Sequence, residues 1–115
     1  MRIFLVLLLL LACSSLAGAK GDLYRAITVN KSFDETYAMV EGLQNKRHYG
    51  ESAECIKYPG RGECILYNRM ANKEVYAIYV EPDIVSGTRV AVYISDMVDS
   101  RMRGEIDKLL RQIKE

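Results

Sequence analysis

Residues 55–64 read CIKYPGRGEC, and this stretch decides the fold because a tight turn at its centre is flanked at equal distance by two cysteines. The Pro-Gly pair at 59–60 suits the turn, and pairing outward from it places Cys55 opposite Cys64 in an antiparallel hairpin. At a non-hydrogen-bonded position of such a hairpin the Cα atoms lie about 4.5 Å apart, at the short limit of disulfide geometry. The sequence therefore predicts a hairpin closed by a disulfide between Cys55 and Cys64.

A metal site and a redox couple are the alternative uses of this cysteine pair. The spacing is not that of a CxxC redox pair, and with His48 as the only histidine a zinc site would lack one ligand. An oxidising compartment outside the cytoplasm would close the disulfide. We therefore expect a structural disulfide, with no metal and no other cofactor.

Further short runs of β-branched and aromatic residues lie on both sides of the hairpin and are separated by turn residues. The connections between the last four runs are too short for a parallel crossover, so we expect antiparallel neighbours. The predicted strands are 24–30, 52–58, 63–70, 74–81 and 88–95.

Two amphipathic helices complete the pattern. Ser32 and Glu35 have the spacing of a capping box and mark the start of the first helix, directly after the first strand. The second helix is expected over 97–114, with Asp96 or Asp99 as its cap. The order strand, helix, four strands, helix predicts an α+β fold, a two-layer sandwich in which an antiparallel sheet carries both helices on one face.

Candidate binding residues lie on the other face of this sheet and in one loop. Alternation along the last two strands points their aliphatic residues towards the helices and leaves Tyr79 and Tyr93 on the opposite face. An aromatic strip on an open sheet is typical of recognition surfaces, although tyrosine is also a good strand former on a half-wet face. His48 and Tyr49 follow the first helix and could contact a ligand, or could belong to an ordinary polar loop.

Residues 1–19, MRIFLVLLLLLACSSLAGA, have the form of a secretory signal, because one positive charge precedes an apolar run too short to span a bilayer. The stretch LLAC at 10–13 resembles the lipobox of bacterial lipoproteins, which implies cleavage before Cys13 and a lipid anchor on that cysteine. The small residues that end at Ala19 offer a rival cleavage site, which would release a soluble protein.

The two cleavage sites lead to two expected locations. A lipidated Cys13 followed by Ser14 resembles outer-membrane sorting, so we expect the protein on the periplasmic side of the envelope, anchored to the outer membrane. Cleavage after the second site makes it soluble, either periplasmic or secreted. In both cases residues 20–22 form a tether and 23–115 form a single domain.

Charge and motif content exclude several functions. Lys and Arg number 16 and Asp and Glu 15, and loss of Arg2 with the signal leaves a formal charge of zero, so a nucleic-acid partner is not expected. With one histidine, no GxSxG serine and no glycine-rich phosphate loop, the chain lacks the parts of the common catalytic schemes. We expect no enzymatic activity.

The element order resembles a reduced helix-grip arrangement, as in small bacterial envelope lipoprotein domains of unknown function. The first functional hypothesis is a non-enzymatic envelope protein that binds another envelope component. A carrier or sensor would instead hold a small apolar ligand between helix and sheet, in a void near Met39, Leu43, Met102 and Ile106. An inhibitor of a secreted hydrolase is a third hypothesis, which size and disulfide allow.

Overall fold

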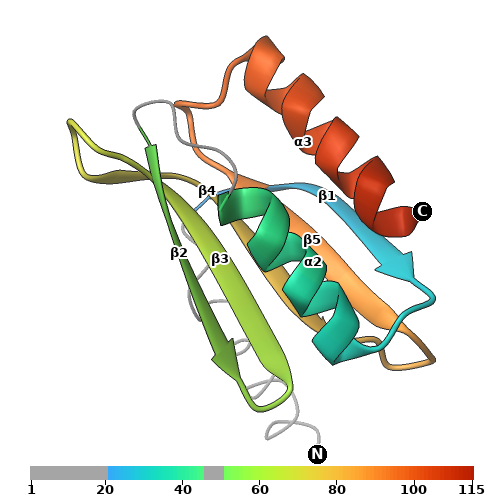
Figure 1. Ribbon diagram of the computed structural model, residues 1–115. Helices are drawn as coiled ribbons and strands as arrows, with labels where there is room; N and C mark the ends of the chain where they lie inside the picture. The colour runs from blue at the N-terminus through green and yellow to red at the C-terminus, as the bar shows by residue number, and fades with distance from the viewer. Residues whose placement is uncertain (1–20, 46–50) are drawn as a thin grey trace, which may run out of the picture.

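Five antiparallel strands form one sheet in the described part of the computed structural model, in the order β1-β5-β4-β3-β2 (Figure 1). The structure describes residues 21–45 and 51–115. Both helices pack on the same face of this sheet, so the predicted α+β sandwich, its element order and its helix placement are confirmed. Along the chain the elements are β1 (Asp22–Val29), α2 (Phe33–Asn45), β2 (Glu51–Tyr58), β3 (Arg61–Asn68), β4 (Lys73–Pro82), β5 (Thr88–Ile94) and α3 (Ser100–Lys114).

The hairpin of β2 and β3 has the predicted register. Tyr58 pairs with Arg61, and the ladder continues to Cys55 opposite Cys64. The two cysteines form the predicted disulfide, with their Cα atoms 4.1 Å apart. Gly60 has a φ of 72° in the turn, a left-handed conformation that glycine adopts without steric cost.

The capping residue that the sequence indicates starts α2. The Ser32 hydroxyl accepts a hydrogen bond from the Glu35 amide at 3.2 Å, and the Ser32 carbonyl accepts another from the Thr36 hydroxyl at 2.7 Å. The helix then lays its Tyr37 ring against β3 at Gly62, where a Cβ atom would lie 2.2 Å from that ring. The absence of a side chain at this position lets α2 approach the sheet.

The helix α3 starts later than the helical spacing of its apolar residues predicts. Asp99 caps it by accepting a hydrogen bond from the Met102 amide at 2.8 Å, so Asp99 and not Asp96 is the cap. Before the cap, the Val98 amide bonds to the Ser95 carbonyl at 3.2 Å in a turn that buries the Val98 side chain. The helix therefore begins three residues after the predicted start at Met97, and it ends at Lys114 as predicted.

The core lies between the helices and one face of the sheet. Tyr76, Ile78 and Val80 of β4 point into the core, as predicted. Ala77 and Tyr79, which alternate with them along the strand, lie on the opposite face. Neighbouring strands and both helices supply the rest of the core, which includes Val29, Val40, Leu66, Val90, Val92, Ile106, Leu109, Leu110 and Ile113.

The strand β1 pairs with β5, the last of the described strands, which places β1 at one edge of the sheet beneath α3 (Figure 1). The register shifts between Leu23 and Arg25, so Tyr24 occupies an irregularity in the strand. From there the Tyr24 hydroxyl donates to both carboxylate oxygens of Asp107 at 3.1 Å, and Arg25 Nε lies 2.8 Å from the same carboxylate. These contacts connect the edge strand to α3.

Candidate recognition face

Two rows of paired residues cross the face of the sheet opposite the helices. In the first row Ile65 pairs with Ala77, Ala77 with Tyr93, and Tyr93 with Leu23. The second row runs next to it through one residue of each strand: Ile56, Glu63, Tyr79, Ala91 and Ala26. On β2 the first row ends at Glu54, the partner of Ile65. We call the two rows without Glu54 and Glu63 the apolar band, which consists of Leu23, Ala26, Ile56, Ile65, Ala77, Tyr79, Ala91 and Tyr93.

Tyr79 and Tyr93 lie at the centre of the apolar band and contact each other. Their ring centroids are 5.5 Å apart with an interplanar angle of 78°, an edge-to-face arrangement that aromatic rings favour. The Arg61 guanidinium carbon lies 5.1 Å from the centroid of the Tyr79 ring, within cation–π range. The sequence therefore identified two residues that the fold does bring together.

The two tyrosines differ in exposure and in acidity. Tyr79 is 7% exposed, whereas Tyr93 is half-buried, so Tyr93 presents the accessible part of the pair. Burial, with a further contribution from the Glu63 carboxylate, raises the pKa of Tyr79 to about 12. The open aromatic strip expected from the sequence is thus a buried ring beside a half-buried one, because the Tyr79 ring lies against neighbouring side chains on its own face.

The ends of the apolar band are more accessible than its centre. Leu23 on β1 is 52% exposed and Ile56 on β2 is 46% exposed, although both are large aliphatic side chains. Sequence reasoning missed both as site residues, because their inclusion requires the strand order and the register. Alternation within their own strands would have shown only that they point away from the core.

Paired charges border the apolar band on one side. Arg61 lies 3.6 Å from Glu63, and Arg89 on β5 lies 3.6 Å from Glu81 on β4. Glu81 and Arg89 are also cross-strand partners. This side of the apolar band therefore carries two cations and two carboxylates, and Glu54 beside Ile65 adds an exposed carboxylate to the same face.

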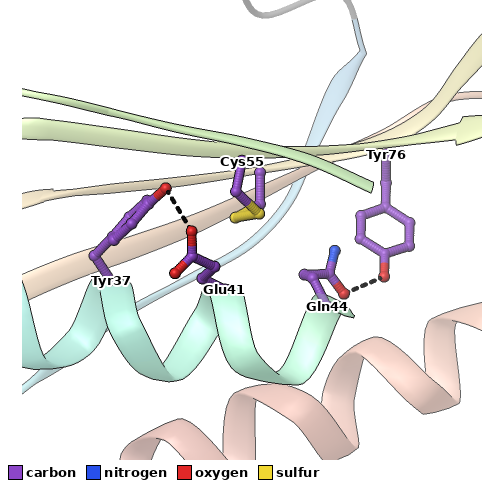
Figure 2. Close-up of a disulfide and its surroundings, with 6 residues drawn as sticks. Tyr37, Glu41, Gln44, Cys55 and Tyr76 are labelled. Carbon is purple, nitrogen blue, oxygen red and sulfur yellow. Dashed lines mark hydrogen bonds between the residues drawn. A yellow bond between two sulfur atoms is a disulfide. The ribbon is translucent and has the colours of Figure 1, made fainter. Parts of the chain in front are cut away.

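The disulfide and a buried polar pair lie on the opposite, helix-covered face (Figure 2). There the Tyr76 hydroxyl donates to Gln44 Oε1 at 3.0 Å, while the buried Gln44 amide nitrogen has no hydrogen-bond partner among the described residues. Nearer the start of α2 the Tyr37 hydroxyl donates to Glu41 at 3.4 Å. The pKa of Tyr37 is raised mainly by burial and, to a smaller extent, by the negative charge of Glu41. An ordered water is the usual partner for a buried amide such as Gln44 Nε2.

The remaining residues predicted from the sequence do not belong to the apolar band. Cys13, His48 and Tyr49 lie outside the described residues. Around the ligand position expected of a carrier, Ile106 is buried and Met39 and Met102 are half-buried. Two hollows of about 270 and 320 Å³ open elsewhere on the described surface, the first between β1 and α3 and the second beside the start of α2.

Across residues 21–45 and 51–115, no group of three or more His, Cys, Asp or Glu side chains is placed to hold a metal ion. Among the helices of that same part of the chain, none combines the length and the apolar content needed to cross a membrane. No protein-family model matches the chain, and no curated protein matches its sequence.

Proposed function

We propose that this chain is a non-enzymatic binding module of the cell envelope, which recognises another protein through the apolar band. The observation that carries the proposal is an apolar row that crosses four strands, from the exposed Leu23 on β1 through Tyr93 and Ala77 to Ile65 on β3. The exposed Ile56 on the other edge strand lies diagonal to Ile65 on the same face. An apolar centre with aromatic side chains and a polar border is the usual composition of a protein–protein interface.

The charges at the border favour a protein partner over a lipid surface. In each of the pairs Arg61–Glu63 and Arg89–Glu81 the positive charge is balanced by a carboxylate. Binding to anionic lipid headgroups depends instead on an excess of Lys and Arg. A partner that places an apolar patch on Leu23 and Tyr93 can complete its edge with polar groups of either sign. The proposed partner is therefore a folded protein with an apolar patch and a mixed polar rim.

The proposed location is the periplasmic side of the cell envelope. Residues 1–19 would direct export, and lipidation of Cys13 would anchor the domain to the outer membrane. The disulfide between Cys55 and Cys64 supports the export part of this proposal, because such bonds persist in oxidising compartments.

Site-specific photo-crosslinking in the native envelope tests the proposed surface. A crosslinking amino acid placed at Leu23, Tyr93 or Ile56 should give adducts with one and the same protein. The same amino acid at Arg101 or Gln112, exposed on α3 behind the sheet, is the matched control and should give no such adduct.

A competing substitution makes the outcome decisive. With the crosslinker at Ile56, the change Leu23→Asp at a side chain that is 52% exposed should abolish the adduct, while the circular dichroism and melting of the protein stay close to those of the parent. Adducts that form equally from both faces, or that persist in the Asp variant, would overturn the proposal.

A further inference from the structure

The outer edge of β1 is open within the part of the chain that the structure describes. This strand ends the sheet order and pairs on one side with β5, and no described strand pairs with its other side. An edge strand of this kind offers a row of backbone N–H and C=O groups to an incoming strand. Beyond the irregularity at Tyr24 the strand runs regularly over 25–29, a length within the usual range of strands and sufficient for such an addition.

A groove runs beside this edge, between β1 and α3. Its volume is about 270 Å³, and its lining comes from two residues of β1 and four of α3: Arg25, Ile27, Asp107, Leu110, Arg111 and Lys114. Ile27 is half-buried and Leu110 is buried, so the groove has an apolar floor.

The groove carries an excess of positive charge. Its single carboxylate, Asp107, is already occupied by Arg25 Nε at 2.8 Å and by the Tyr24 hydroxyl at 3.1 Å. Among the described residues Arg111 and Lys114 take part in no ion pair, so two positive charges remain for an external anion. Guanidinium and ammonium groups at the wall of a groove bind carboxylates by charge-assisted hydrogen bonds.

We infer that this groove binds an extended acidic peptide, which adds to the outer edge of β1 as a sixth strand. Successive residues of a strand point to opposite faces, so every second residue of the peptide enters the groove. A carboxylate at one such position meets Arg111 and Lys114, and an apolar side chain at the next lies on Ile27 and Leu110. This site is separate from the apolar band, which lies on the other face of the sheet.

Peptide binding measured by calorimetry tests the charge requirement. The probe is the blocked octapeptide Thr-Glu-Thr-Val-Thr-Glu-Thr-Val, and its counterpart with lysine in place of glutamate should not bind. The double change Arg111→Gln and Lys114→Gln should weaken binding of the acidic peptide by about tenfold or more, as expected for the loss of a charge-assisted contact. The change Arg101→Gln with Arg103→Gln removes the same charge from exposed positions outside the groove and should leave the affinity nearly unchanged.

Backbone methylation tests strand addition separately from charge. Methylation of alternate peptide nitrogens on the edge that faces β1 should abolish binding, whereas methylation of the other set should leave it intact. Bound peptide should also slow hydrogen exchange at outward-pointing amides of β1 and not at those of β2, the other edge strand. Equal binding of the two methylated peptides, equal effects of the two double variants, or binding of decanoate but not of the peptide would each overturn the inference.

Discussion

At the scale of single residues, Gly62 is the position where the packing of α2 on the sheet is most easily disturbed. A Cβ atom at this residue would lie 2.2 Å from Cδ1 of Tyr37, an aromatic ring held in the core. We predict that Gly62→Ala destabilises the protein by about 1–3 kcal/mol, because ring and helix must shift to relieve the overlap. Urea denaturation of the parent and the variant measures the change.

The chain contains a matched control for this substitution. Gly104 lies inside α3, and a Cβ atom there would meet nothing within 4 Å. Gly104→Ala should stabilise the protein by up to about 1 kcal/mol, because alanine has the higher helix propensity. If both substitutions changed stability in the same direction, the close approach of Tyr37 to Gly62 would not be the cause.

Tyr79 makes stability depend on alkaline pH. Its pKa is raised from 10.0 to about 12 in the folded protein, chiefly by burial, so the folded state holds this proton more tightly than the unfolded chain. The resulting stabilisation is complete below pH 10 and is lost as the pH rises towards 12. Urea midpoints of the parent should fall more steeply over this interval than those of Tyr79→Phe, and parallel curves for the two proteins would contradict the prediction.

At the scale of elements, the disulfide holds an edge strand that has one strand neighbour. The strand β2 pairs with β3 alone among the described strands, and the covalent link lies near the middle of that pair. Closing a loop of this length contributes about 2.7 kcal/mol in the chain-entropy account. We predict that the double change Cys55→Ala and Cys64→Ala lowers the free energy of unfolding by about this amount.

Hydrogen exchange tests whether the disulfide also holds β2 locally, beyond its effect on the unfolded chain. Amides of β2 should exchange faster in the double variant than in the parent, while amides of β4, which is paired on both sides, should change only as much as global stability requires. Uniform acceleration across the sheet would mean that the disulfide acts on the unfolded chain alone. That outcome would contradict a local role in holding β2.

The elements that were predictable from sequence are those set by neighbouring residues. The hairpin register follows from the Pro-Gly turn at 59–60, and the start of α2 follows from Ser32, whose hydroxyl bonds within one helical turn. The pairing of β1 with β5 joins residues such as Leu23 and Tyr93, which are far apart in the chain, and nothing local specifies it. The first turn of α3 was misjudged because Val98 is buried by a turn and not by the helix.

At the scale of the whole molecule, the candidate sites also combine features set by neighbouring residues with features set by residues far apart in the chain. Tyr79 and Tyr93 could be placed on one face because their strands are neighbours in sequence as well as in space. Leu23 joins them only through the β1–β5 pairing, and the groove of Arg25, Asp107 and Arg111 requires α3 to lie over that edge. Sites made by strands and helices distant in sequence depend on topology, which alternation and capping do not determine.

Three cysteines also bear on the whole molecule, because two of them form the disulfide and Cys13 is left over. We predict that cells grown with labelled palmitate incorporate the label into the parent protein and into the variant with Cys55→Ala and Cys64→Ala, but not into Cys13→Ala. A diacylated cysteine carries enough buried CH₂ groups, at about 0.8 kcal/mol each, to keep the protein on the membrane, so Cys13→Ala should move it to the soluble fraction. Mass spectrometry of the mature N-terminus provides the independent check. A chain that starts at Lys20 and carries no label would establish cleavage after Ala19 and would contradict the anchor.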